Sequence, residues 1–166
     1  RDFLDDIVQA GVNRISIGVE SFDIDNLKIL EREADFKDLK QKFELIRNRG
    51  IDNINIDLMY ALPGEKLSIL KKDLQAFIKL NPAHISTYSL MIEDHTKLGI
   101  NGCEYVTPEL DSKMYETICK VLKKNGYKHY EVSNFAKEGF ESRHNLNYWN
   151  NGEYYGYGLG ASGYKS

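Results

Sequence analysis

The segment Asn53-Ile54-Asn55-Ile56-Asp57-Leu58 decides the fold, because polar and apolar residues alternate along its whole length. Alternation with a period of two predicts a β-strand with one apolar and one polar face. The segment Arg14-Ile15-Ser16-Ile17-Gly18-Val19-Glu20 repeats this pattern. We expect the apolar faces to pack against helices and the polar faces to line an open cavity that holds a polar ligand. The alternative is a half-open antiparallel sheet whose polar face meets water.

Amphipathic helices are predicted on either side of these strands. Apolar residues recur at helical spacing within residues 3–8, 36–46 and 67–78, and Asp35 is a typical N-cap for the second of these helices. A third strand is expected over residues 84–90. This alternation of strands and helices predicts an α/β fold with a parallel sheet, either doubly wound or barrel-like.

The second half of the chain has a different pattern. Thr107-Pro108 begins a helix that ends at Gly126, and Tyr127 to Val132 is predicted to be a further strand. A loop is expected from Phe135 to Phe140. The segment Glu141 to Asn151, which carries the only Trp, is too polar and too aromatic for an ordinary linker or core segment. One domain with an extension is the simplest account.

Composition narrows the class of protein. The chain has 166 residues, of which 42% are hydrophobic and 28% are charged, and its formal net charge is -3. This length allows one domain with a sizeable core, and the charge balance does not suggest a nucleic-acid binder. No apolar run reaches the roughly 20 residues of a membrane-spanning helix. With two cysteines and no Asn-x-Ser/Thr site, a cytoplasmic protein is expected.

Polar side chains follow the predicted strands at the end where parallel α/β folds place their sites. Glu20 and Asp57 are the leading candidates, and Arg32 could supply a counter-charge. Taken alone, neither carboxylate identifies a reaction.

Several motifs resemble one family, the radical S-adenosylmethionine family of oxygen-independent coproporphyrinogen III oxidases and their HemW-type haem-chaperone relatives. The matching segments are Gly11 to Phe22, Arg32, Asn55 to Gly64, Asn81 to Ser86, Tyr88 to Leu90 and Tyr130 to Ala136. The segment Ser142 to Trp149 is similar to the HemW branch rather than to the oxidases. The resemblance covers essentially the whole chain.

The resemblance implies a fold and a set of binding residues. The family fold is an incomplete (β/α)6, TIM-like barrel followed by an α+β extension, so the chain would hold the later barrel strands in about residues 1–95 and the extension in about residues 96–166. The family's contacts to S-adenosylmethionine fall on Glu20, Arg32 and Asp57, and a backbone contact falls on Met91. A guanidinium can hold the cofactor's carboxylate in a bidentate pair.

Two positions depart from the family pattern. Glu20 stands where the family usually has glutamine, which adds negative charge to the cofactor cavity. Ser162 follows Ala161 where the chaperone branch usually has histidine.

An iron–sulfur cluster of this family needs three closely spaced cysteines. Cys103 and Cys119 are far apart, and Cys119 is expected to be a buried structural thiol. We therefore expect no metal ligands in this chain. The chain, which begins at Arg1, is interpreted as a fragment that lacks the N-terminal cluster loop and the C-terminal domain and that is inactive alone.

His144 is a candidate haem ligand, since a neutral imidazole is a common iron donor. The alternative is that His144, Asn145, Asn147 and Tyr148 form a hydrogen-bonded corner that fixes the extension against the barrel. The other three histidines, His84, His95 and His129, show no metal-ligand spacing.

Two functions follow from the resemblance. The first is a haem chaperone that binds S-adenosylmethionine and haem and passes haem to an acceptor protein. The second is an enzyme that decarboxylates coproporphyrinogen III oxidatively to protoporphyrinogen IX, with a porphyrinogen as substrate. The Ser142 to Trp149 segment favours the chaperone. An unrelated barrel enzyme for a polar metabolite would explain the strand faces but not the motifs.

Overall fold

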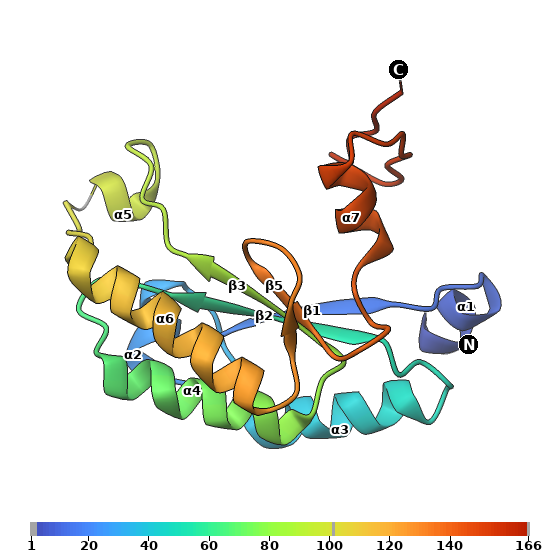
Figure 1. Cartoon of the computed structure of the whole chain (residues 1–166), viewed down its shortest axis with the longest axis horizontal. Coiled ribbons are helices and arrows are strands. Elements are labelled where there is room, and N and C mark those ends of the chain that lie inside the picture. The colour runs from blue at the N-terminus through green and yellow to red at the C-terminus, as the bar shows by residue number, and fades with distance from the viewer. Residues whose placement is uncertain (1–2, 101, 166) are drawn as a thin grey trace.

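A computed structural model describes residues 3–100 and 102–165 of the chain. A five-stranded sheet with the strand order β1-β2-β3-β5-β4 forms its centre (Figure 1). The strands are β1 (Ile15–Glu20), β2 (Ile54–Tyr60), β3 (His84–Ser89), β4 (Lys128–His129) and β5 (Asn134–Ala136). The first three are parallel, which confirms the predicted α/β sheet and excludes an antiparallel arrangement of these strands.

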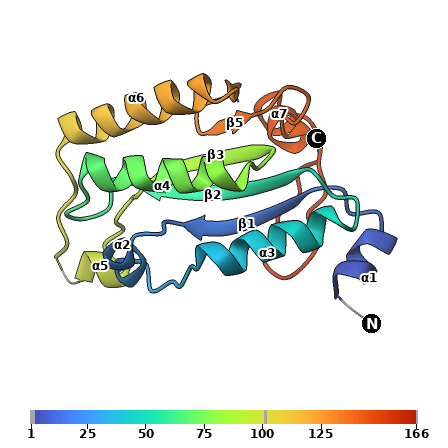
Figure 2. The same ribbon diagram turned by 90° about the horizontal axis from the view of Figure 1, so that it is seen from below.

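Three long helices cover one face of this sheet. They are α3 (Phe36–Arg47), α4 (Leu67–Leu80) and α6 (Pro108–Lys124), which lie side by side in Figures 1 and 2. Asp35 caps α3 and Thr107 caps α6 through their side-chain oxygens, as the sequence predicts. Two of the short helices are α1 (Phe3–Gln9) and α5 (Lys97–Ile100).

The core lies between the sheet and these helices. Ile54, Ile56 and Leu58 of β2 are fully buried and pack with Phe43 of α3 and Phe77 of α4. Burying aliphatic and aromatic side chains of this size supplies most of the favourable free energy of folding, at about 25 cal/mol per Å² of apolar surface. The predicted apolar strand face is therefore the helix-covered face.

The opposite face of the sheet is polar, and α7 (Arg143–Trp149) with the C-terminal tail stands on this side (Figure 1). The register places polar residues beside one another across the strands. Ser16 pairs with Asn55 and Asn55 with His84, while Asp57 pairs with Ser86. The sheet thus presents a row of polar side chains that no long helix covers.

The predicted strand Tyr127 to Val132 is wrong in its extent. Only Lys128 and His129 are extended and paired, and the chain then turns so that β5 runs antiparallel to β3. Part of the expected Phe135 to Phe140 loop is therefore strand. The strand is shorter than predicted because β4 lies at the edge of the sheet and pairs with the three-residue strand β5, all of whose residues are buried.

Two elements near the candidate sites were not predicted. A short helix α2 (Ile24–Ile29) follows β1 and is capped by Asp23. The segment from Arg143 to Trp149 forms the helix α7, capped by Ser142. Among the described residues, no helix is long and apolar enough to cross a membrane.

Candidate functional site

Glu20 ends β1 and turns back over the polar face of the sheet. Its backbone has a φ of 61°, and one carboxylate oxygen lies 3.7 Å from Nη2 of Arg32. A Cβ at Gly18 would meet Oε1 of Glu20 at 3.0 Å, so the glycine leaves room for this carboxylate. The sequence-predicted pair of Glu20 and Arg32 is thus brought together.

Glu20 and Arg32 differ in exposure, and this difference decides which of the two charges a ligand can reach. The Glu20 side chain is 15% exposed and the Arg32 side chain 61% exposed. Burial raises the pKa of Glu20, Arg32 lowers it, and the nearby Asp57 raises it further. The exposed guanidinium can therefore exchange Glu20 for a ligand carboxylate at a modest cost, because such partly exposed pairs contribute about 1 kcal/mol or less.

Asp57 lies on the polar face of β2, on the neighbouring strand. It accepts hydrogen bonds from Nδ2 of Asn55 at 2.8 Å and from Oγ of Ser16 at 3.4 Å. These two contacts leave acceptor capacity on its carboxylate, since an ionised carboxylate offers about four lone-pair sites. Asp57 can accept further hydrogen bonds from an amino group or from hydroxyl groups.

The loop after β1 is held by a buried carboxylate that sequence reasoning missed. Asp73 of α4 accepts a hydrogen bond from Oγ of Ser21 and another from the backbone N–H of Phe22 at 3.0 Å. Asp73 occupies the same buried helix face as Leu70 and Phe77. A charged residue on an otherwise apolar helix face is the signal that could have found it.

A second buried carboxylate, Glu65, holds the turn after β2. Its Oε2 accepts from the backbone N–H of Leu62 at 3.1 Å, whereas its buried Oε1 has no partner among the described residues. Burial raises the pKa of Glu65 to about 7. Both carboxylates support loops at the edge of the sheet that carries Glu20.

Met91 follows β3 at this same edge, but its side chain is 80% exposed. The neighbouring residues are fixed. The N–H of Leu90 donates to the carbonyl of Tyr60, and both backbone groups of Ile92 bond to the Tyr105 hydroxyl. Backbone contact from this loop to a ligand is compatible with that geometry.

His144 lies in the first turn of α7, and this helix stands near the end of the sheet at which β3 begins (Figure 1). Glu20 is the last residue of β1 and so lies at the other end of the parallel strands. Its exposed imidazole has no hydrogen bond to a described residue and stands edge-on to Tyr154 at a ring distance of 5.1 Å. The alternative to haem ligation is a hydrogen-bonded corner that includes His144. In the part of the chain that the structure describes, His144 does not take part in such a network. Asn147 does bond to the carbonyl of Glu153 and Trp149 to the carboxylate of Glu131.

A pocket of about 240 Å³ lies beside this helix. Its lining includes His144, Tyr148 and Trp149 from α7, together with Tyr88 and the buried Asn134. Oδ1 of Asn134 has no partner among the described residues. Exposed aromatic rings around a free imidazole suit a flat apolar ligand with a metal centre.

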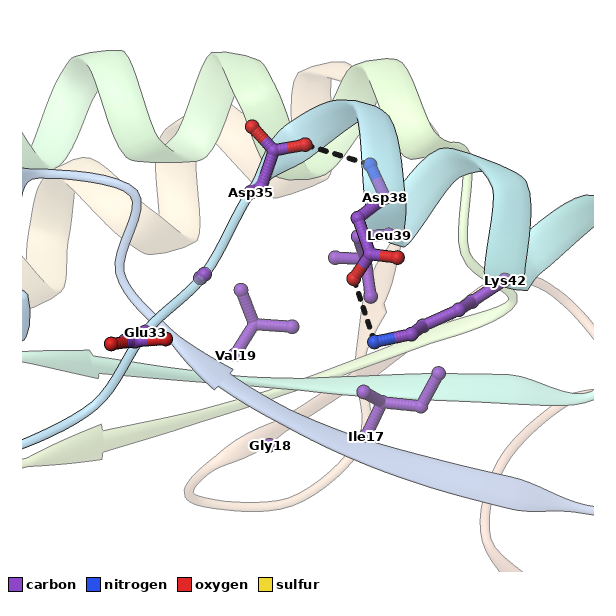
Figure 3. Close-up of a pocket in the computed structure, with 9 residues that line it drawn as sticks. Ile17, Gly18, Val19, Glu33, Asp35, Asp38, Leu39 and Lys42 are labelled. Atoms are coloured by element: carbon purple, nitrogen blue, oxygen red, sulfur yellow. Dashed lines mark hydrogen bonds and ion pairs between the residues drawn. The ribbon is translucent and has the colours of Figure 1, made fainter.

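A different pocket, of about 480 Å³, lies between β1 and α3 (Figure 3). Ile17, Val19 and Leu39 line it together with the ion pair of Asp38 and Lys42, whose atoms are 2.7 Å apart. It opens on the helix-covered side of β1, the edge strand of the sheet. It is therefore separate from the polar face.

The polar face suits S-adenosylmethionine in the chemistry of its side chains. Arg32 offers a guanidinium for a carboxylate, and Glu20 and Asp57 offer acceptors for an ammonium group and ribose hydroxyls. The absence of a side chain at Gly18 lets the Glu20 carboxylate lie over the strand on this face. When bound, this cofactor would supply a sulfonium that can be cleaved reductively to a radical.

An iron–sulfur cluster does not fit the described residues. Cys103 and Cys119 are free and half-buried, and no group of three or more His, Cys, Asp or Glu side chains in the described part could hold a metal ion. Burial raises the pKa of the Cys119 thiol, as expected of a structural cysteine. No step through a cluster can be assigned to these residues.

Known proteins are similar to this chain in sequence. A sequence profile described as the Radical SAM superfamily matches residues 1–77. "Heme chaperone HemW" of Lactococcus lactis subsp. lactis (strain IL1403) is 42% identical over 173 residues, a match that covers 98% of the chain and 45% of the relative. The protein of the same name from Bacillus subtilis (strain 168) is 42% identical over 160 residues, covering 94% and 42%. The chain thus spans less than half the length of these relatives.

A solved structure shares the fold. The structure titled "Coproporphyrinogen III oxidase (HemN) from Escherichia coli is a Radical SAM enzyme" superposes with a TM-score of 0.81 at 20% identity, covering 98% of this chain and 41% of that one. At this identity the likeness establishes the fold, which is a part of the radical-SAM barrel.

The chain therefore belongs to the radical S-adenosylmethionine superfamily. Within that superfamily, it is a HemW-like protein. The predicted family is confirmed, and S-adenosylmethionine and a 4Fe-4S cluster are the cofactors that this superfamily implies.

Proposed function

We propose that this chain is the later barrel part of a haem chaperone of HemW type, which binds S-adenosylmethionine and haem. The identity of 42% across 98% of the chain supports this proposal, because the similarity extends through α7 and the tail beyond the shared barrel motifs. Glu20, Arg32, Asp57 and the backbone at Met91 would contact S-adenosylmethionine at the carboxyl ends of the strands.

The observation that carries the haem proposal is the free imidazole of His144. It is exposed, lacks a hydrogen bond to the described residues and lines a pocket with Tyr148 and Trp149. Buried or structural histidines normally have hydrogen-bond partners for their ring nitrogens. A free histidine among exposed aromatic rings is thus available as an axial ligand.

The rest of the protein would supply what these residues lack. We propose that residues 1–95 contribute barrel strands and residues 96–166 the extension, with the cluster thiolates and a further domain outside this chain. The chain covers 45% and 42% of these relatives, so they contain further segments that could hold such parts. A haem-acceptor protein and a cytoplasmic location remain parts of the same proposal.

The first experiment separates a chaperone from an oxidase. The full-length protein is reconstituted with its cluster anaerobically and supplied with S-adenosylmethionine and coproporphyrinogen III, and protoporphyrin is followed by fluorescence. A chaperone is expected to form no product while its cluster is demonstrably intact. Product at catalytic turnover would overturn the proposal in favour of oxidative decarboxylation.

The second experiment tests the haem ligand. We expect His144→Ala to weaken haem binding at least tenfold and to shift the Soret band, because an iron–imidazole bond is lost. His95→Ala is the matched control, since His95 is an exposed histidine in the loop after β3. Equal haem affinity and spectra for the two variants would exclude His144 as the ligand.

A further inference from the structure

Asn55 lies at the middle of the polar face and uses every hydrogen-bonding group of its side chain. Its amide Nδ2 donates to Oγ of Ser16 at 2.6 Å and to Oδ1 of Asp57 at 2.8 Å. Its Oδ1 accepts from Oγ of Ser86 at 3.1 Å and from Nδ1 of His84 at 2.6 Å. Two donors and two lone pairs are the full capacity of an asparagine amide.

The directions of these bonds follow from Asp57. An ionised carboxylate can only accept, so the amide of Asn55 must turn its Nδ2 toward Asp57 and its Oδ1 toward His84. His84 must then carry its proton on Nδ1, which leaves Nε2 as an acceptor for the Tyr130 hydroxyl at 2.7 Å. The Tyr130 oxygen in turn accepts from the backbone N–H of Ser142 at 3.2 Å.

His84 is held in the neutral form that this arrangement requires. It is fully buried, and burial together with the positive charge of Arg14 lowers its pKa to about 3. A charged ring would donate at both nitrogens, and the Tyr130 hydroxyl could no longer donate to it. The neutral form of His84 therefore agrees with the directions of its hydrogen bonds to Asn55 and Tyr130.

Ser142, the last residue in this series of hydrogen bonds, begins the helix α7. Ser142 is the N-cap of α7, and its Oγ accepts from the N–H of Asn145 at 3.3 Å. Tyr130 thus contacts the residue that caps the turn carrying His144.

We propose that Asn55, His84 and Tyr130 form a directional hydrogen-bond relay that fixes the first turn of α7 relative to Asp57. His84 and Tyr130 are positioning residues, and neither needs to touch a ligand. The relay joins the polar face that is proposed to bind the cofactor to the segment that would bind haem, and in that respect the inference rests on the proposed function. Buried, fully satisfied networks of this kind hold one arrangement of the groups they join.

The relay itself is tested by the protonation state of His84, without any haem. The full-length protein is labelled with ¹⁵N-histidine, and His84 is assigned by the loss of its signals in His84→Gln. We expect a neutral ring protonated on Nδ1 at pH 7 and unchanged at pH 5. A ring protonated on Nε2, or a charged ring, would overturn the relay.

The positioning role is tested with Tyr130→Phe, which keeps the ring and removes the hydroxyl. Haem affinity is expected to fall about tenfold, the effect of losing one hydrogen bond to a buried group. Tyr115→Phe is the matched control, because the Tyr115 hydroxyl bonds to the Val132 carbonyl and to His129, outside the relay. Wild-type affinity in Tyr130→Phe would overturn the positioning role even if haem binding is real.

The two tests fail in different ways. Wild-type protein that binds no haem would remove the proposed function, and the His84 tautomer would still decide the relay. Should Tyr130→Phe fail to fold, hydrogen exchange of the 142–149 amides in His84→Phe replaces it, with Ser86→Ala as the control. His84→Phe removes both ring nitrogens that join Asn55 to Tyr130, and equal protection of these amides in the two variants would count against the relay.

Discussion

Glu20 adopts a backbone conformation, with a φ of 61°, that residues other than glycine rarely take. The surrounding contacts hold it there. The N–H of Ser21 bonds back to the carbonyl of Val19, and Asp73 fixes Ser21 and Phe22 beyond it. Such strain at the end of a strand aims the Glu20 carboxylate across Gly18, where the cofactor is proposed to bind.

Replacing Glu20 by glutamine tests whether its charge competes with the cofactor for Arg32. The pair spans 3.7 Å, and removing the negative charge frees the guanidinium for a ligand carboxylate. We expect Glu20→Gln to bind S-adenosylmethionine about fivefold more tightly, corresponding to about 1 kcal/mol. Calorimetry on the reconstituted full-length protein measures this, with the exposed Glu104→Gln as control. Weaker binding would show that the attraction of the Glu20 charge for the ligand's ammonium group outweighs its competition for Arg32.

Replacing Asp73 tests whether its carboxylate stabilises the loop after β1. Asp73→Ala leaves the Ser21 hydroxyl and the Phe22 N–H without their acceptor in a buried loop. We expect a loss of about 2–4 kcal/mol in the free energy of unfolding. Urea unfolding measures this loss, and Asp52→Ala, at an exposed position before β2, should cost less than about 0.5 kcal/mol. Similar losses in the two variants would contradict the role of Asp73.

Glu65 gives a pH dependence with a defined sign. Its pKa is about 7 in the folded protein against an ordinary value of 4.5, so the folded state keeps a proton that the unfolded state has lost between these values. The free energy of unfolding should therefore fall as pH rises from about 4.5 to about 7, by up to about 3 kcal/mol from this group. Urea unfolding at pH 5 and pH 8 should show this fall in the wild type and a smaller one in Glu65→Gln. An equal fall in both would reject the assignment.

At the scale of elements, the strand β5 connects the barrel to the extension. It pairs with β3 on one side and β4 on the other, and its three residues are buried. Phe135 at its centre is fully buried and stacks on His129 with the ring centroids 4.3 Å apart. The position of Tyr130 and of α7 therefore depends on this short strand.

Truncating Phe135 should destabilise the whole extension. Phe135→Ala is expected to cost about 3–5 kcal/mol, the usual effect of removing a buried aromatic side chain. Val132→Ala, in the exposed turn between β4 and β5, should change stability by less than about 0.5 kcal/mol. Thermal and urea unfolding of the two variants make the comparison. A small effect at Phe135 would mean that β5 is not part of the cooperative core.

At the scale of the whole molecule, the sheet and its helices form one layered unit, with α1 and α7 at its margin (Figure 2). The strand β2 lies between β1 and β3, and its residues Ile54, Ile56 and Leu58 are fully buried. In α7, by contrast, no residue is buried. The molecule should therefore open first at its margin and last at β2.

Amide hydrogen exchange tests this order. We expect the amides of β2 and β3 to exchange slowest, at the rate of global unfolding, and those of α7 and the tail at least a hundredfold faster. Mass spectrometry of peptic fragments resolves these regions. Equal protection of α7 and β2 would show that further parts of the protein cover α7.

The amino-acid sequence by itself determined the periodic elements and the family. The alternation around Asn55 predicted β2, the Asp35 and Thr107 caps predicted helix starts, and the motif series around Glu20 predicted the radical-SAM resemblance. These features depend on neighbours within a few residues, so local pattern is enough to find them.

Only the tertiary structure decided the pairing of β5 with β3, the burial of Asp73 and Glu65, and the bonds from Asn55 through His84 to Tyr130. The last two residues lie 46 positions apart along the chain. A polar side chain shows in the sequence its capacity to donate and accept, but not its partner. The partner is chosen when folding buries these groups together, because each buried donor or acceptor without one would cost about 1–3 kcal/mol.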